Sequence, residues 1–166
     1  MSEITNTKSR KDFFWLMLTF ISLTALGAVE LFEQITYVIN WLVGDPVINA
    51  DSFRKFHHAV DAGVFHFPVS TTVLVGFIML IRKKSNFMKS AAEKNAIWMA
   101  FIAFLITYVI SVYIITGINV PVFNENSVPT ELIPGKLKLW GILNVFRFVL
   151  PAYGIYKLST LLKLKN

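Results

Sequence analysis

The sequence predicts an all-α membrane protein, a bundle of four transmembrane helices that forms a single domain over residues 1–166. Hydrophobic residues make up 55% of the chain and its mean hydropathy is +0.58, well above the range of soluble domains. Four apolar runs are each long enough to cross a bilayer, which takes about 20 helical residues. The chain has no Cys, which excludes disulfides and thiolate chemistry.

The four spans are expected at about 13–34, 62–81, 97–120 and 139–158. The first helix meets no helix-breaking residue before Gly44-Asp45-Pro46, so we expect it to continue beyond the membrane. We expect the second helix to begin in polar sequence, with Asp51-Ser52 as its N-cap, and to project beyond the outer face as well. A basic loop, 82–96, precedes the third span, and a proline-rich stretch that we expect to be irregular precedes the fourth.

The distribution of Lys and Arg predicts the orientation in the membrane. Eleven of these cations lie in the first dozen residues, in the loop 82–96 and in the tail from residue 157. Only four lie on the other side, namely Arg54, Lys55, Lys136 and Lys138. The positive-inside rule therefore places both termini in the cytoplasm of a multi-pass protein of the cell (plasma or inner) membrane. Membrane topology explains the net charge of +6, so we expect no nucleic-acid partner.

Arg147 is the most informative single residue, because it lies inside the fourth apolar run. An arginine at such a depth costs about 2.5–3.5 kcal/mol on insertion scales, so it should face other helices and have partners. Glu30 is the acidic residue that the sequence places inside the apolar part of a span, and we expect an ion pair between Glu30 and Arg147, with Asn144 one turn away. The alternative is that this pair only fixes the register of the helices.

Other polar residues are expected in the same, outer half of the bundle. Gln34 shares a helix face with Glu30, while His66 and Tyr113 come from the second and third spans. The simplest consequence is a polar pocket that opens toward the outer face. We assign a catalytic role to Arg147, Asn144, Glu30 and His66, and a substrate-binding role to Trp140, Asn124, Tyr113 and Gln34.

The histidines leave a metal site as an open alternative. His57, His58 and His66 lie on one predicted helix with Asp61, and imidazole and carboxylate groups are ligands for iron or copper. Polar residues of this kind also commonly solvate the end of a membrane helix. We therefore expect no metal and no other cofactor.

The pattern Trp140-x3-Asn144-x2-Arg147, preceded by Asn119-x-Pro121 and Asn124, resembles the anthrone oxygenase-like family of small four-helix membrane proteins. In the family pattern an Asn stands two residues after the Pro, whereas Asn124 stands three after Pro121. The resemblance implies a four-span fold over nearly the whole chain. It also implies oxidation of a hydrophobic polycyclic phenol to a quinone by O2, with Trp140, Asn144, Arg147 and Asn124 as motif positions.

The sequence therefore predicts an integral membrane protein with an outward-facing polar pocket, and specifically an oxygenase that acts on a lipophilic aromatic or quinol-like compound. Its expected partners are the membrane and a hydrophobic small molecule or lipid, and a homo-oligomer is an open alternative. The rival interpretation is a non-enzymatic membrane subunit or a binder of a lipid, a quinone or a partner helix.

Overall fold

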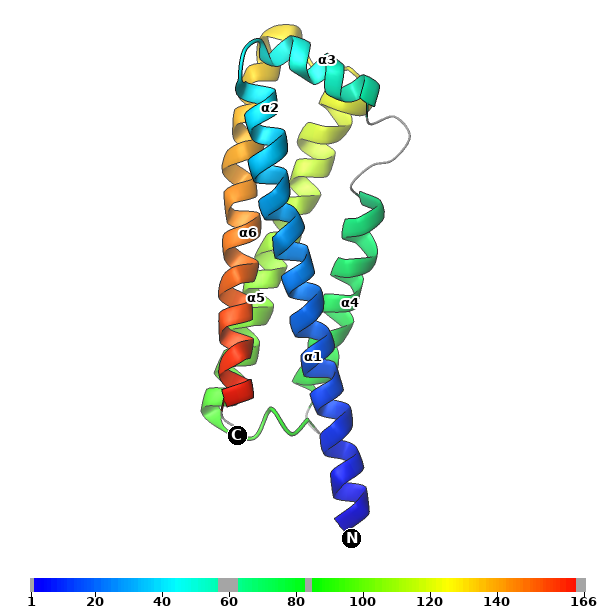
Figure 1. Ribbon diagram of the computed structural model, residues 1–166, viewed down its shortest axis with the longest axis vertical. Coiled ribbons are helices and arrows are strands. Elements are labelled where there is room, and N and C mark those ends of the chain that lie inside the picture. Colours follow the sequence, from blue (N-terminus) through cyan, green and yellow to red (C-terminus); the bar gives the residue numbers. More distant parts are fainter. Residues whose placement is uncertain (1, 57–62, 83–84, 164–166) are drawn as a thin grey trace.

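A computed structural model describes residues 2–56, 63–82 and 85–163 of the chain, and within these residues every long element is a helix (Figure 1). Four helical segments are long and apolar enough to cross a membrane: Arg10–Leu42, Val64–Ile81, Ala91–Asn124 and Thr130–Leu162. The predicted all-α bundle with four spans is therefore confirmed. The elements in chain order are α1 (Ser2–Glu33), η1 (Gln34–Val38), α2 (Ile39–Leu42), α3 (Pro46–Phe56), α4 (Gly63–Ile81), α5 (Ala91–Ile114), η2 (Ile115–Asn124), η3 (Thr130–Leu132) and α6 (Ile133–Lys163).

The outer surface of the bundle is as apolar as its interior. Large side chains such as Ile21, Phe67, Val109 and Ile142 are more than half exposed, which in water would be unfavourable. A helix that is hydrophobic on all sides is typical of a membrane span, because lipid solvates its outward face. The chain is therefore an integral membrane protein that crosses the bilayer several times.

Both termini of the described chain lie at the same end of the bundle, which we call the termini end (Figure 1). The loop between α4 and α5 lies there too, whereas α3 lies at the opposite end, the α3 end. Even numbers of spans give this arrangement, as the sequence predicted. The assignment of the termini end to the cytoplasm remains a prediction from the distribution of cations.

The interior of the bundle is divided into three layers along its axis. Near the termini end, Leu16, Phe77 and Ile97 belong to an apolar core that α1, α4, α5 and α6 share. Near the α3 end, Trp41 and Trp140 belong to a second core, to which α3 contributes Ala50 but α4 contributes no buried residue. Buried polar side chains separate the two cores, and the candidate site lies in this middle layer.

The segment between the first and second spans differs from the prediction. Asp45 caps α3, since its Oδ1 accepts hydrogen bonds from the backbone N–H groups of Val47 (2.8 Å) and Ile48 (3.4 Å). Asp51 and Ser52, the expected N-cap, lie inside α3 instead. Gly44 adopts a positive φ of 83°, which turns the chain sharply before α3. As a result α3 lies across the end of the bundle while α4 runs along it, so the two do not form one straight projecting helix (Figure 1).

Two π-helical segments lie toward the α3 end. One, η1, interrupts the first span directly after Glu33, and the other, η2, ends the third span and contains Pro121. The expected irregular stretch after the third span is thus shorter than predicted, because η2 stays helical up to Asn124. Segments of π-helix are rare and occur frequently at functional sites. Here η1 begins beside the two acidic residues of the polar layer.

Candidate functional site

Arg147 is the centre of the polar layer, with only 4% of its surface exposed. Its Nε donates to Ser111 Oγ (3.0 Å), and its Nη1 donates to Asn144 Oδ1 (3.0 Å) and Glu33 Oε2 (3.3 Å). Its Nε also lies 3.4 Å from Glu30 Oε1. The third span, the fourth span and the first span therefore meet at one guanidinium group, as expected for an arginine held inside a membrane bundle.

The expected pairing of Glu30 with Arg147 is present as an ion pair, but Glu30 is not the main acidic partner. Glu33, which the sequence analysis left outside the site, is 4% exposed and makes the hydrogen bond to Arg147. The two acids stand three residues apart, so they occupy one face of the helix. This spacing is the signal in the sequence that Glu33 shares the buried face with Glu30. The apolar run that follows Glu33 also indicates that Glu33 is buried.

Asn144, which the sequence places one turn from Arg147, connects the first and fourth spans. Its Nδ2 donates to the backbone carbonyl oxygen of Glu30 (2.9 Å) and to Gln34 Oε1 (3.2 Å). Its Oδ1 is the acceptor for Arg147. Both ends of the fully buried amide are therefore used, and the amide fixes the position of the guanidinium relative to the helix that carries the acids.

His66 joins the cluster from α4. Its Nε2 lies 2.8 Å from Glu33 Oε1, and 13% of its side chain is exposed. Glu33 therefore contacts both basic groups, with one carboxylate oxygen on His66 and the other on Arg147. A carboxylate in this position orients an imidazole ring, which is the arrangement of a His–acid pair in general-base catalysis.

Aromatic side chains close the polar layer at the α3 end. The Trp140 ring packs edge-on against Trp41 (4.8 Å between centroids) and lies 5.9 Å from the Arg147 guanidinium carbon. Trp140 Nε1 donates to Asn119 Oδ1 (2.9 Å), which fixes the ring. Phe53 of α3 and Phe123 pack against Trp41 on its other sides. Within the described residues α3 lies over this end of the bundle and supplies part of the aromatic layer, and the pocket open toward the outer face stays a prediction.

Two predicted binding residues lie apart from the cluster. Tyr113 is 47% exposed on the surface of the bundle, since it follows Ser111 by two residues and so points to a different side of α5. Asn124 is exposed at the end of η2, on the far side of the aromatic layer. His57, His58 and Asp61, which carry the metal alternative, lie outside the described residues. Within residues 2–56, 63–82 and 85–163 no group of three or more metal-binding side chains is arranged around a common point.

The charges of the cluster do not balance. Two buried carboxylates face a single guanidinium, and the fourth member is an imidazole. Both carboxylate oxygens of Glu30 are buried and, within the described part of the chain, neither accepts a hydrogen bond. A buried carboxylate without hydrogen bonds is costly, so Glu30 is the member best suited to receive a proton or a donor group.

One nitrogen of Arg147 is also unused. Its Nη2 makes no hydrogen bond to any described residue, whereas Nε and Nη1 are both engaged. The layer thus contains an imidazole held by a carboxylate, a guanidinium nitrogen open to an oxygen atom, and a carboxylate without donors.

In comparisons with protein-family models, curated proteins and solved structures, nothing matches this chain.

Proposed function

We propose that this integral membrane protein is an oxygenase that acts on a lipophilic aromatic compound, and that it begins by removing a proton from the substrate. The observation that supports this most directly is the chain of contacts from His66 through Glu33 to Arg147, with distances of 2.8 and 3.3 Å. Such a base and such an oxyanion stabiliser are the groups needed to make an enolate from an activated CH2 beside an aromatic ketone. The resemblance of the Trp140, Asn144 and Arg147 pattern to the anthrone oxygenase-like family supports the same class of substrate.

In the proposed reaction His66 accepts a proton from the activated CH2 group. The negative charge moves to the oxygen of the aromatic ketone, which becomes an enolate, and Arg147 Nη2 stabilises that oxygen. The electron-rich carbanion passes one electron to O2, and the two radicals combine to form a carbon–oxygen bond. The peroxide takes up the proton from His66. Removal of the second C–H proton by His66 then breaks the O–O bond, and the released hydroxide takes that proton. The balance is one CH2 group and one O2 in, one carbonyl group and one water out.

The other polar residues have supporting roles in this proposal. Glu33 orients the imidazole ring of His66 through a contact of 2.8 Å. Asn144 holds Arg147 in place through Oδ1. Glu30, whose carboxylate accepts no hydrogen bond from the residues that the structure describes, can hold the proton that the cluster would otherwise lose to solvent. Gln34 contributes indirectly, because it fixes the amide of Asn144.

A second candidate function is a non-enzymatic membrane subunit, in which the cluster only fixes the register of the helices. The observation that favours it is that Arg147 already has three hydrogen bonds within the protein and lies under an aromatic layer. Buried ionic groups sometimes serve specificity of packing alone.

Oxygen consumption with a lipophilic anthrone as substrate distinguishes the two candidates. Purified protein in detergent should consume one O2 per quinone formed, and the variants His66→Ala and Glu33→Gln should lower the rate by about 10²–10⁴-fold, the usual contribution of a general base. Arg147→Lys should also be inactive, because lysine lacks the planar group with a spare nitrogen. Tyr108→Phe, a change on the lipid-facing surface, is the control that keeps full activity. No turnover by correctly folded wild-type protein would favour the subunit.

A further inference from the structure

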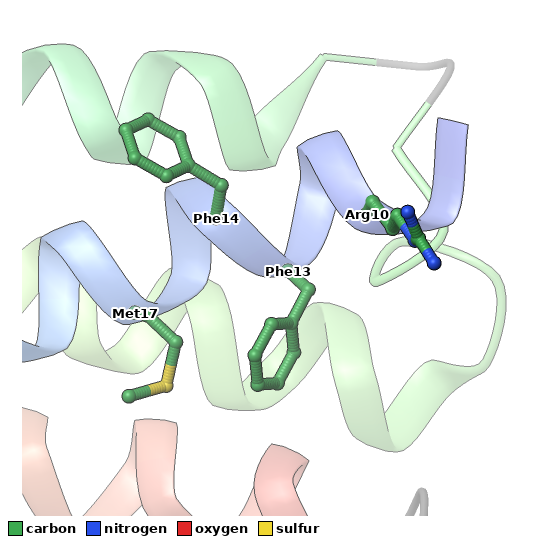
Figure 2. A pocket seen from close by; sticks show the side chains of 4 residues that line it. All are labelled: Arg10, Phe13, Phe14 and Met17. Carbon is green, nitrogen blue, oxygen red and sulfur yellow. The ribbon is translucent and has the colours of Figure 1, made fainter. Parts of the chain in front are cut away.

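A second site lies at the termini end of the first span, far from the polar layer. Arg10, Phe13, Phe14 and Met17 line an open hollow of about 450 Å³ on α1 (Figure 2). Phe13 and Met17 point to the same side of the helix and Phe14 to another, while Arg10 lies one turn closer to the N-terminus. Phe13 and Phe14 are each about half exposed. The hollow is therefore an apolar surface with a single cation at one edge.

Arg10 belongs to the polar start of the chain and stands three residues before Phe13, where the apolar run of the first span begins. This is the depth at which lipid phosphates lie, because the hydrocarbon starts with the apolar residues that follow. Its exposed side chain can reach the headgroup region while the helix around it faces acyl chains.

Among residues 10–56, 64–82 and 85–162, no acidic side chain forms an ion pair with Arg10. The nearest acid along the helix, Asp12, is 1% exposed and fully engaged. Its Oδ1 accepts from Arg82 Nη2 (3.3 Å) and its Oδ2 accepts from the backbone N–H of Asn86 (2.8 Å). Asp12 is thus used to attach α1 to the loop after α4, and it leaves the guanidinium of Arg10 without this neighbouring carboxylate.

We propose that the hollow binds an anionic phospholipid, with the phosphodiester on Arg10 and an acyl chain against Phe13 and Met17. A guanidinium presents two parallel N–H donors that match two phosphate oxygens. A zwitterionic headgroup binds these donors less readily, because its own ammonium group competes for the same phosphate oxygens. Phe13 and Met17 stand one helical turn apart, so they extend the contact along the direction in which an acyl chain descends into the bilayer. The site is independent of the proposed oxygenase reaction.

Lys11 provides a matched control for Arg10. It is the next residue, it is exposed, and it carries the same charge, but it does not line the hollow. Successive residues on a helix point about 100° apart. A lipid held at the hollow therefore depends on Arg10 and not on Lys11, whereas attraction by the general surface charge depends on both equally.

Native mass spectrometry of the whole protein, released from micelles that contain phosphatidylglycerol and phosphatidylcholine in equal amounts, tests the proposal. Wild-type protein and Lys11→Gln should both retain one phosphatidylglycerol in preference to phosphatidylcholine. Arg10→Gln should lower this retention by about fivefold, the factor expected when one basic residue no longer contacts an anionic lipid. Phe13→Ser should lower the retention of phosphatidylglycerol while Arg10 is still present, and inorganic phosphate should not displace the lipid.

Three results would overturn the proposal. Equal losses in Arg10→Gln and Lys11→Gln would mean that only the general surface charge attracts the lipid. Unchanged retention of phosphatidylglycerol in Arg10→Gln would mean that the guanidinium does not bind the lipid. Displacement of the lipid by inorganic phosphate would mean that the site binds an anion without contacting an acyl chain. The helix content of each variant, measured by circular dichroism, should equal that of the wild type, because both cations are exposed.

Discussion

The substitution Arg147→Leu tests whether charge or hydrogen bonding holds the polar layer together. It removes three donated hydrogen bonds, to Ser111, Asn144 and Glu33. Interhelical bonds of this kind average about 0.6 kcal/mol inside membrane proteins, so their loss accounts for roughly 2 kcal/mol of the free energy of unfolding. The change also takes the guanidinium away from two buried carboxylates, and breaking a buried pair from one side costs about 3–5 kcal/mol. We expect the larger value.

The assay is reversible unfolding in mixed micelles, in which dodecyl sulfate replaces a mild detergent and circular dichroism follows the helices. The triple variant, which adds Glu30→Gln and Glu33→Gln to Arg147→Leu, has no buried charge left without a partner. Its free energy of unfolding should be only roughly 2 kcal/mol below that of the wild type, which is the contribution of the lost hydrogen bonds. A loss of only roughly 2 kcal/mol in Arg147→Leu, with no recovery in the triple variant, would refute the reasoning from charge.

The two acids should differ in the same assay. Double-mutant cycles with Arg147 should give a larger coupling energy for Glu33, which makes a hydrogen bond, than for Glu30, which makes an ion pair at 3.4 Å without one. Glu30→Gln alone should change stability by less than about 1 kcal/mol, because no hydrogen bond to a carboxylate oxygen is lost. If the losses of stability in the two single variants of Glu33 and Arg147 add up to the loss in the double variant within about 0.5 kcal/mol, Glu33 and Arg147 do not interact.

Three further predictions concern the membrane fold. Reporter fusions at positions 1, 88 and 166 should report the cytoplasm and fusions at 48 or 128 the opposite compartment, and the reverse pattern would contradict the positive-inside assignment. Gly76→Ala should destabilise the protein by about 1–3 kcal/mol, because its new Cβ would lie 2.0 Å from Thr19 Oγ1. Gly135→Ala, where nothing lies within 4 Å, is the control and should be neutral or slightly stabilising in the same unfolding titration. Trp140→Phe should lower stability by about 1 kcal/mol, because Asn119 Oδ1 loses its donor, and Asn119→Ala should abolish that difference.

Much of the fold follows from hydropathy alone. The length of the apolar runs predicted four spans, and the structure contains each of them, the first, third and fourth with longer ends. The interaction of Arg147 with Glu30 was predictable as well, because an arginine inside hydrocarbon needs an acid from another helix. The contact between Asn144 and Arg147 follows from their spacing on one helix.

Other features depend on packing between elements and leave little trace in one sequence. Glu33 precedes residues that the hydropathy pattern assigns to an interfacial extension, so its burial became apparent only when His66 and Arg147 were both placed beside it. The direction of α3 depends on the turn at Gly44, whose positive φ a sequence pattern does not specify. The depth of Tyr113 in the membrane predicts a binding role, yet depth does not decide which side of a helix faces the interior, and Tyr113 is exposed.

The π-helical segment η1 has a consequence for how this protein tolerates insertions and deletions. A π-helical turn amounts to one residue more than an α-helical turn would hold, so deleting one residue between Gln34 and Val38 would convert the turn to ordinary α-helix. Trp41 and the residues up to Gly44 would keep nearly their present orientation, because the i→i+5 hydrogen bonds would become i→i+4 bonds between the same flanking groups. Deleting one residue from the regular helix between Glu30 and Glu33 would instead rotate the two sides by roughly 100° relative to each other. The indole of Trp41 would then leave its contact with Trp140. The segment η1 therefore tolerates the loss of one residue that the α-helix before it does not.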